Sequence, residues 1–261
     1  METTFAQPDV ADMFERLLVP SVFDRYARDL VERARPFGPS DRILDLGCGT
    51  GIVARVLRER LGGGARLAGV DISAAMIAKA RSLAPEIEWH QASAAELPFP
   101  DRSFEVVLSQ QMLQFCPDRR GVLREVRRVL TPGGRLVAST WRPRPLQPVY
   151  HALGLLTERH LGPSSDLRWS LDAEELGSLL TGAGFADVRV ETVSLTELYS
   201  DFPVRMSAMA ARHDLAAFDD DERARRWAEV EAESAAVLAR FAVAGGIANP
   251  SVTNVAVGRV P

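Results

Sequence analysis

A short glycine-rich turn carries the residues of this chain with the clearest capacity for chemistry. Asp45 stands in an apolar run, and Gly47, Gly49 and Gly51 follow at alternate positions before a helical pattern begins. Glycine tolerates positive φ and lets a ligand approach the backbone. Twenty residues past Gly51, Asp71 ends a second apolar run, where a carboxylate can accept hydrogen bonds from both hydroxyls of a ribose. The pattern indicates a nucleotide-binding turn.

A dinucleotide site fits this turn poorly. After Gly47 and Gly49, the third glycine of the Gly-x-Gly-x-x-Gly fingerprint would fall on Ile52. The fingerprint also gives no role to Asp45, whereas a carboxylate before the turn can face a cationic ligand directly or fix the loop. A nicotinamide-dependent oxidoreductase is therefore the weaker hypothesis.

The elements that must position these residues alternate along residues 41–141. Apolar runs predict strands at 42–46, 67–70, 87–90, 104–109 and 135–141, with helical spacing between them. Such alternation predicts a parallel sheet with helices on both faces, and ligands of such sheets bind beyond the carboxyl ends of the strands. Two helices, broken near Pro20, are expected before the sheet over 8–35.

The chain after the sheet is less specific. The segment 142–145 predicts a stiff linker, and 146–183 looks helical with an interruption around 162–165. Further strands are expected at 188–198 and 252–260. Residues 203–243 look mostly helical, with a charged amphipathic helix over 219–244.

Several segments resemble the class I methyltransferases that use S-adenosylmethionine (SAM). The run Asp-Leu-Gly-Cys-Gly-Thr-Gly over 45–51 looks like their motif I, and Val70-Asp71-Ile72-Ser73 looks like motif II. The resemblance continues through 97–104, 113–118 and 129–136. The family that these segments resemble is methyltransferase type 11, the ubiquinone/menaquinone-biosynthesis-like branch. The resemblance implies SAM as cofactor and a small acceptor, such as a natural product, a quinone or a lipid-like metabolite.

The family's fold gives the expected architecture. We predict an α/β fold with a Rossmann-like, seven-stranded, mostly parallel sheet whose last strand is antiparallel, with helices on both faces and a helical cap. Residues 1–40 would be N-terminal helices covering the cofactor site, and 41–141 the SAM-binding core. Residues 142–261 would form the cap and substrate region with the last two strands.

The resemblance also implies cofactor contacts. The three glycines would line the methionine and ribose portions of SAM, and the carboxylate of motif II would hold the ribose hydroxyls. Many relatives have an acid where Ser93 stands, and a serine hydroxyl accepts from the adenine amino group more weakly than a carboxylate. Phe14 matches a position that is often tyrosine and would cover the cofactor. The predicted cofactor-binding residues are Phe14, Asp45, Gly47, Cys48, Gly49, Gly51, Asp71, Ile72, Met76, Ser93, Ala94 and Gln110.

Catalytic residues are harder to predict because the methyl group of a sulfonium is already activated, so positioning can achieve much of the rate. Gln114 stands where the family often has histidine and can orient an acceptor. His151 is a natural general base near pH 7. The segment 109–112 lacks the Asn/Asp-Pro-Pro-Tyr motif of enzymes that methylate amino groups of nucleic acids or glutamine, and it lacks the acids of metal-dependent O-methyltransferases, so no metal is expected.

Two other activities stay open. The serine at position 93 and the absent histidine pair leave room for a SAM-fold enzyme that does not methylate, such as a cyclase or isomerase. The nicotinamide-dependent oxidoreductase is the more remote alternative. No motif identifies the acceptor atom, which could be oxygen, nitrogen, carbon or sulfur.

Composition restricts the partners. The net charge is -4, and acids interleave with the arginines, which disfavours nucleic acid. The first residues lack the pattern of a signal peptide, and no uncharged run approaches the about 20 residues that span a bilayer. Two cysteines make no disulfide framework. We expect a cytoplasmic monomer or homodimer that binds a small-molecule acceptor and neither nucleic acid nor membrane.

Overall fold

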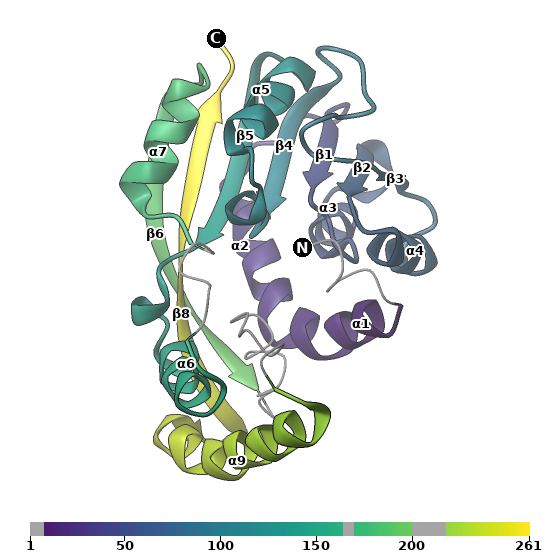
Figure 1. Cartoon of the computed structure of the whole chain (residues 1–261). Helices are drawn as coiled ribbons and strands as arrows, with labels where there is room; N and C mark the ends of the chain where they lie inside the picture. Colours follow the sequence, from purple (N-terminus) through teal and green to yellow (C-terminus); the bar gives the residue numbers. More distant parts are fainter. Residues whose placement is uncertain (1–7, 164–169, 200–217) are drawn as a thin grey trace. The chain divides into compact units, whose positions relative to one another are not determined.

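The computed structural model describes residues 8–163, 170–199 and 218–261, and its centre is an eight-stranded mixed sheet in the order β3-β2-β1-β4-β5-β8-β6, with β7 paired to β8 (Figure 1). The first five strands pair in parallel, and β8 runs antiparallel to β5. The strands are β1 (Arg42–Leu46), β2 (Arg66–Asp71), β3 (Glu88–Gln91), β4 (Phe104–Gln110), β5 (Leu130–Trp141), β6 (Ala186–Tyr199), β7 (Ala242–Val243) and β8 (Gly246–Arg259). The predicted α/β fold with an antiparallel last strand is confirmed, and the two-residue β7 adds to the seven expected strands.

Helices fill most of the connections between the strands. The longer ones are α1 (Pro8–Met13), η1 (Phe14–Phe23), α2 (Asp24–Arg33), α3 (Ile52–Leu61), α4 (Ala74–Leu83), α5 (Arg119–Val129), α6 (Pro148–Leu161), α7 (Ala173–Gly182) and α9 (Asp220–Leu238). Single short turns occur at η2 (Gly62–Gly64), η3 (Leu113–Phe115), η4 (Arg144–Leu146) and η6 (Ala239–Phe241).

The predicted break near Pro20 is wrong. Residues 8–33 are helical throughout, and η1 is built of wide π-helical turns that contain this proline. The N–H of Asp24 reaches the carbonyl of Val19, five residues back. A proline ring clashes with the carbonyl four residues before it in an α-helix, and a wider turn relieves that clash.

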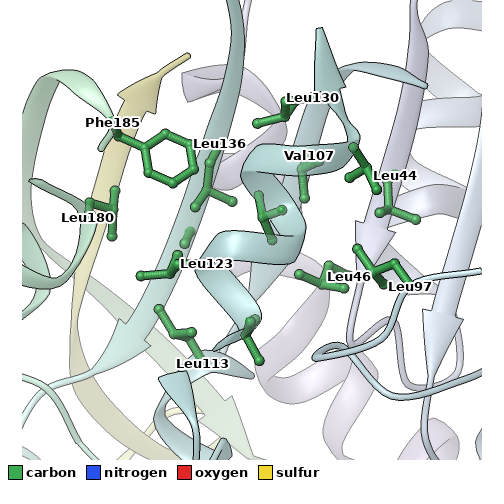
Figure 2. Close-up of a cluster of buried hydrophobic side chains, with 14 of the residues drawn as sticks. Leu44, Leu46, Leu97, Val107, Leu113, Leu123, Leu130, Leu136, Leu180 and Phe185 are labelled. Atoms are coloured by element: carbon green, nitrogen blue, oxygen red, sulfur yellow. The ribbon is translucent and has the colours of Figure 1, made fainter. Parts of the chain in front are cut away.

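A buried apolar layer joins one face of the sheet to α5 and α7. Leu44, Val107 and Leu136 project from neighbouring strands toward Leu123 of α5, as Figure 2 shows, and Leu180 of α7 completes the layer. The opposite face of the sheet is covered by α2, which contacts β4 and β5, and by α3, which contacts β1 and β2. The carboxyl ends of β1, β2 and β4 are therefore held from both sides.

The turn after α5 does not leave the sheet. The sequence predicts this strand only from residue 135, yet β5 already begins at Leu130. Leu130 pairs with Phe104, and the pairing then jumps to Arg135 opposite Val106. The four intervening residues form an irregularity in the strand rather than a separate loop.

The described chain divides into two compact units. The first comprises Met1–Trp141, Leu171–Val193 and Thr253–Pro261, and the second comprises Arg142–Ser170 and Ser194–Val252. The two helices α6 and α9 pack together in the second unit, where His160 lies between Glu229 and Glu233 at 3.0 and 2.9 Å. Strands β6 and β8 contribute residues to both units.

The late helix is shorter than the sequence suggests. It ends at Leu238 instead of 244, and a single turn, η6, leads into a hairpin between β7 and β8. Ala244 and Gly245 form the turn of that hairpin, where Gly245 has φ of 95°, and Gly246 is the first residue of β8. The predicted interruption around 162–165 lies partly outside the described residues, and the helical stretch expected over 203–219 lies largely outside them.

Candidate cofactor-binding site

The glycine turn is fixed to the strand beside it. The backbone N–H groups of Gly47 and Cys48 both donate to the carbonyl oxygen of Val70, at 2.8 and 2.9 Å. Gly47, Gly49 and Gly51 all have positive φ, at 69°, 54° and 86°. Such conformations strain residues that carry a side chain, so the glycine spacing seen in the sequence is a backbone requirement of this turn.

The carboxylate of Asp71 lies against the glycine turn. Its Oδ2 accepts from the N–H of Gly49 at 2.9 Å, and its Oδ1 accepts from the N–H of Ser73 at 2.9 Å. Burial raises the pKa of this carboxyl, and the two amide donors oppose that shift. The half-buried side chain keeps lone pairs on both oxygens beyond these bonds, since a carboxylate offers about four acceptor sites.

Asp45 lies beneath the turn and is 1% exposed. Its Oδ2 accepts from the N–H of Ala54 at 3.0 Å, which satisfies one of the free donors at the start of α3. Its Oδ1 has no partner among the residues that the structure describes. Burial raises the pKa of Asp45 to about 7, and the charge of Asp71 adds to the effect. A cation would relieve both effects, because it stabilises an ionised carboxylate.

Each glycine of the turn has a different neighbour. A Cβ at Gly51 would stand 2.4 Å from the ring of Trp89, and one at Gly47 would stand 2.1 Å from Cγ of Met112. At Gly49 a Cβ would meet only Phe14, at 4.0 Å, among described atoms. The backbone at Gly49 is thus the open part of the turn, while the other two glycines admit protein side chains.

The N-terminal helices are fastened to this turn by contacts that the sequence did not suggest. Glu15 on η1 accepts from the hydroxyl of Thr50 at 2.6 Å and pairs with Arg55 of α3 at 2.7 Å. On α1, Asp12 pairs with Lys79 of α4 at 2.6 Å. A glutamate on an amphipathic helix carries no sequence signal for such a role, so only the fold reveals it.

The residues predicted to surround the adenine ring lie along the ends of β2 and β3. Ile72 is 52% exposed, unusual for a large apolar side chain, whereas Met76 is buried on α4. Ser93 is half-buried, and its hydroxyl accepts from the N–H of Ala95 at 3.2 Å. Ala94 lies between them on the same loop, which begins where the N–H of Ala92 donates to the carbonyl of Asp71.

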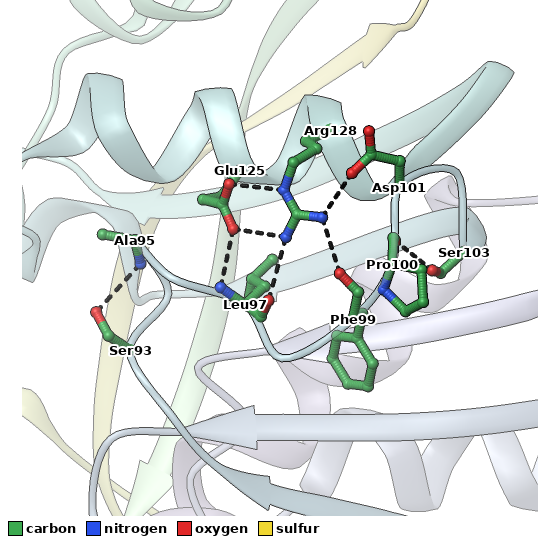
Figure 3. A network of polar contacts seen from close by, with 9 residues as sticks. All are labelled: Ser93, Ala95, Leu97, Phe99, Pro100, Asp101, Ser103, Glu125 and Arg128. Carbon is green, nitrogen blue, oxygen red and sulfur yellow. Dashed lines mark hydrogen bonds and ion pairs between the residues drawn. The ribbon is translucent and has the colours of Figure 1, made fainter.

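A single arginine holds the rest of that loop. Figure 3 shows Arg128 of α5 bound to both oxygens of Glu125, to the carboxylate of Asp101 and to the carbonyls of Leu97 and Phe99. These contacts measure 2.7–3.1 Å. Arg128 and Glu125 therefore hold the loop after β3 against α5, mainly through backbone atoms of that loop.

Three glutamine amides lie at the end of β4 and just after it. Gln110 donates from Nε2 to the carbonyl of Phe23 at 3.0 Å, which joins the strand end to the N-terminal helices. Gln114 is buried in η3 and accepts at Oε1 from the N–H of Trp141 at 3.3 Å. Gln111 lies between them and was not singled out from the sequence. His151 lies in the second unit, in the first turn of α6.

Neither the thiol of the glycine turn nor the acidic and histidine side chains of the described chain form a reactive or metal-binding centre. Cys48 is buried beside Gly69, and burial raises the pKa of its thiol, so little thiolate forms near neutral pH. Within the described ranges, no group of three or more His, Cys, Asp or Glu side chains is arranged to hold a metal ion. No described helix is long and apolar enough to cross a membrane.

The fold and the site together define a class of enzyme. A parallel sheet that presents two carboxylates and an open glycine backbone at its carboxyl edge can hold an adenosyl group by its ribose and a positive charge beside it. The unpartnered Oδ1 of Asp45 fits a cationic cofactor such as SAM.

Comparison with known proteins gives the family. The methyltransferase domain family matches residues 44–138. Demethylmenaquinone methyltransferase of Thermus thermophilus is 35% identical over 202 residues, covering 70% of this chain and 90% of that protein. A ubiquinone/menaquinone biosynthesis C-methyltransferase of Desulfotalea psychrophila is 31% identical, with 70% and 81% covered. The chain belongs to the ubiquinone/menaquinone methyltransferase-like family of class I SAM-dependent methyltransferases, and it is an enzyme that methylates a small molecule with SAM.

A solved structure supports the fold. Phosphoethanolamine N-methyltransferase 2 of Haemonchus contortus, crystallised with SAM, superimposes with a TM-score of 0.64 at 18% identity. The match covers 100% of this chain and 59% of that protein.

Proposed function

We propose that the enzyme binds SAM on the glycine turn and transfers its methyl group to a small, uncharged acceptor of the quinol or phenol type. The observation that carries the cofactor site is the pair of carboxylates at one turn, Asp71 bonded to the N–H of Gly49 and Asp45 with a free buried oxygen. The acceptor class is supported by the quinone-related names of the two relatives above.

Individual residues take the following roles in this proposal. Asp71 accepts hydrogen bonds from the ribose hydroxyls, and Asp45 faces the positive end of the cofactor across the turn. Ile72 supplies an apolar surface for adenine, which explains its exposure. Phe14 covers the open backbone at Gly49.

Methyl transfer needs positioning more than acid–base chemistry. Bound SAM supplies a methyl group already activated by its sulfonium. The acceptor's nucleophilic atom would bond to that carbon as the carbon–sulfur bond breaks, with the electron pair of that bond left on sulfur, and a protonated acceptor would release its proton to solvent. Gln114 cannot take up this proton at neutral pH. His151 remains a predicted base whose role depends on its distance from the acceptor.

Substitution of Asp71 tests the cofactor site. Asp71→Ala removes a charged hydrogen-bond acceptor, and each such bond contributes about 1.5–3 kcal/mol, so we expect the Kd for SAM to rise at least about 30-fold. Calorimetry with SAM measures it. Glu59→Gln, which changes an exposed ion pair with Arg28, serves as the control and should leave the Kd unaltered. Equal affinities of the Asp71→Ala variant and the native protein would remove the proposed site.

The sequence also supports proposals about location, assembly and partners. We propose that the enzyme is cytoplasmic, is a monomer or homodimer, and has no nucleic-acid partner. Release of S-adenosylhomocysteine with a methylated product separates the enzyme from a SAM-fold cyclase or isomerase, which would release none.

A further inference from the structure

Gln111 combines two unfavourable features at the end of β4. Its side chain is 4% exposed, yet neither Nε2 nor Oε1 has a hydrogen-bond partner among residues 8–163, 170–199 and 218–261. Its backbone has φ of 53°, a conformation that residues other than glycine, asparagine and aspartate seldom adopt. An unpaired buried amide and a strained backbone both destabilise a fold, and such features concentrate at functional sites.

The backbone of Gln111 is nevertheless firmly placed. Its N–H donates to the carbonyl of Ser139 at 2.9 Å, so it continues the pairing of β4 with β5. The next residue, Met112, lies against Gly47 of the glycine turn. Gln111 is therefore one residue away from the side chain that contacts the cofactor turn, at the edge where the methyl group must be passed on.

Other unpaired polar atoms gather around the same strand ends. The hydroxyls of Ser109, Ser139 and Thr140 have no partner within the described chain, and all three side chains are buried. Ser109 and Ser139 lie on the paired strands β4 and β5, within one residue of each other's register position. Serine and threonine hydroxyls both donate and accept, and none of the three carries charge.

We propose that Gln111 is the acceptor-recognising amide of the enzyme, and that it binds an uncharged ring presenting a hydroxyl next to a second oxygen. Nε2 donates to one oxygen, and Oε1 accepts the hydrogen of the neighbouring hydroxyl. A primary amide offers these two functions side by side, which matches a vicinal pair and not a carboxylate, a phosphate or an ammonium group. This inference rests on the proposed function, because it takes the acceptor to bind beside SAM.

Burial strengthens such recognition. A hydrogen bond formed away from water is electrostatically stronger, and a ligand that lacks the matching hydroxyl leaves the amide unpaired. Sites of this kind reject the analogue without the hydroxyl far more strongly than apolar pockets reject a missing methylene. Gln111 then orients the nucleophile without deprotonating it.

Binding experiments with two naphthalenes test the inference. The protein is saturated with S-adenosylhomocysteine, and 2,3-dihydroxynaphthalene or 2,3-dimethoxynaphthalene is titrated in. We expect the diol to bind at least tenfold more tightly than the dimethoxy compound, and Gln111→Met to abolish that preference. The Kd for S-adenosylhomocysteine should stay within about twofold, since Gln111 is assigned to the acceptor.

Thermal stability distinguishes recognition from a structural role. Gln111→Met replaces an unpaired amide by an apolar side chain, so the Tm should rise by about 2–4 °C. Gln147→Met is the matched control, because the buried amide of Gln147 is bonded to Arg142 and Val252. Its Tm should fall.

The outcomes separate the inference from the proposed function. A diol preference that survives in Gln111→Met, an absent preference in the native protein, or a lowered Tm in Gln111→Met would overturn the assignment of Gln111 while leaving SAM binding intact. Loss of S-adenosylhomocysteine binding in Gln111→Met would move the residue to the cofactor site. No binding of S-adenosylhomocysteine by the native protein would instead refute the proposed function.

Discussion

At the residue scale, the site depends on two carboxylates that are largely shielded from solvent. Asp71 receives two backbone donors, whereas Asp45 receives one and keeps a free oxygen. Burial raises the pKa of both. A positive charge at the turn would thus be bound more strongly when the carboxyls are ionised, which makes cofactor affinity dependent on pH.

We expect the Kd for SAM to fall by about tenfold as the pH rises from 5.5 to 7. With a pKa of about 7, Asp45 is mostly protonated at the lower pH, and the apparent affinity scales with the ionised fraction. Calorimetry across this range measures the effect. Asp45→Asn keeps an acceptor for the N–H of Ala54 but cannot ionise, so its Kd should be higher and nearly flat with pH. A native Kd that stays constant over this range would contradict the role given to Asp45.

The residues around these carboxylates show what sequence reasoning can and cannot reach. The glycine spacing and Asp71 are visible in the sequence because a backbone with positive φ restricts residue type. The unpaired state of Gln111 is invisible there, because hydrogen-bond satisfaction depends on β5 and the N-terminal helices. The only feature of the sequence that points to Gln111 is its place next to an apolar strand. Gln110 has the same place, yet its Nε2 has a partner, so the sequence does not distinguish the two.

At the element scale, Glu15 supplies the side-chain hydrogen bond and the ion pair that join the N-terminal helices to the glycine turn and to α3. Glu15→Ala removes bonds to Thr50 and Arg55, so we expect the free energy of unfolding to drop by about 1–2 kcal/mol and the Kd for SAM to rise severalfold. Chemical denaturation and calorimetry measure these effects. Hydrogen exchange should also speed up across 8–23.

An exposed ion-pairing glutamate provides the comparison. Glu32 contacts Arg35 and Arg60 with its side chain 55% exposed, so Glu32→Ala should change stability by about 0.5 kcal/mol or less. It should leave the Kd for SAM unaltered. If the two variants behave alike, Glu15 is merely another surface charge and the helices reach the turn without it.

Sequence periodicity predicted the elements of the first unit better than those at its margins. Strand β1 has the bounds that were expected, whereas β8 begins at Gly246 and not at 252. The early part of β8 escaped notice because its inward residues include Asn249 and Ser251, which are buried but polar. Pattern analysis counts such residues as loop, and it likewise takes Pro20 for a break, because neither bonding partners nor wide turns appear in a sequence.

At the scale of the whole molecule, three carboxyls among the described residues have pKa values raised by burial, and they lie in two different units. Asp45 and Asp71 lie at the glycine turn. Glu197, in the second unit, accepts from Tyr199 at 2.7 Å, from Asn249 at 2.8 Å and from the hydroxyl of Ser251. These donors favour the ionised form, but burial outweighs them and raises the pKa of Glu197.

Two carboxyls that form half-exposed ion pairs have pKa values shifted in the opposite direction. Pairing with Arg42 lowers the pKa of Glu105 against the effect of its partial burial, and pairing with Arg128 lowers that of Glu125. A carboxyl whose pKa is lowered by folding adds stability at pH values above its pKa in the unfolded chain. That stability is lost as the pH falls through its pKa in the folded protein. A carboxyl with a raised pKa behaves oppositely, since its folded form favours the proton.

These signs predict that the protein without cofactor is most stable near pH 4.5–5 and loses stability as the pH rises toward 7. For Asp45, the difference between about 7 and its ordinary 3.8 corresponds to about 4 kcal/mol over the whole range from below pH 3.8 to pH 7, and about 2–3 kcal/mol of it is lost between pH 5 and 7. Chemical denaturation at successive pH values measures the profile. Asp45→Asn should flatten it by most of that amount, while saturating SAM should move the optimum upward, because the cation stabilises the ionised carboxylates. A native profile that rises from pH 5 to 7 without cofactor would show that these carboxyls are hydrated in solution.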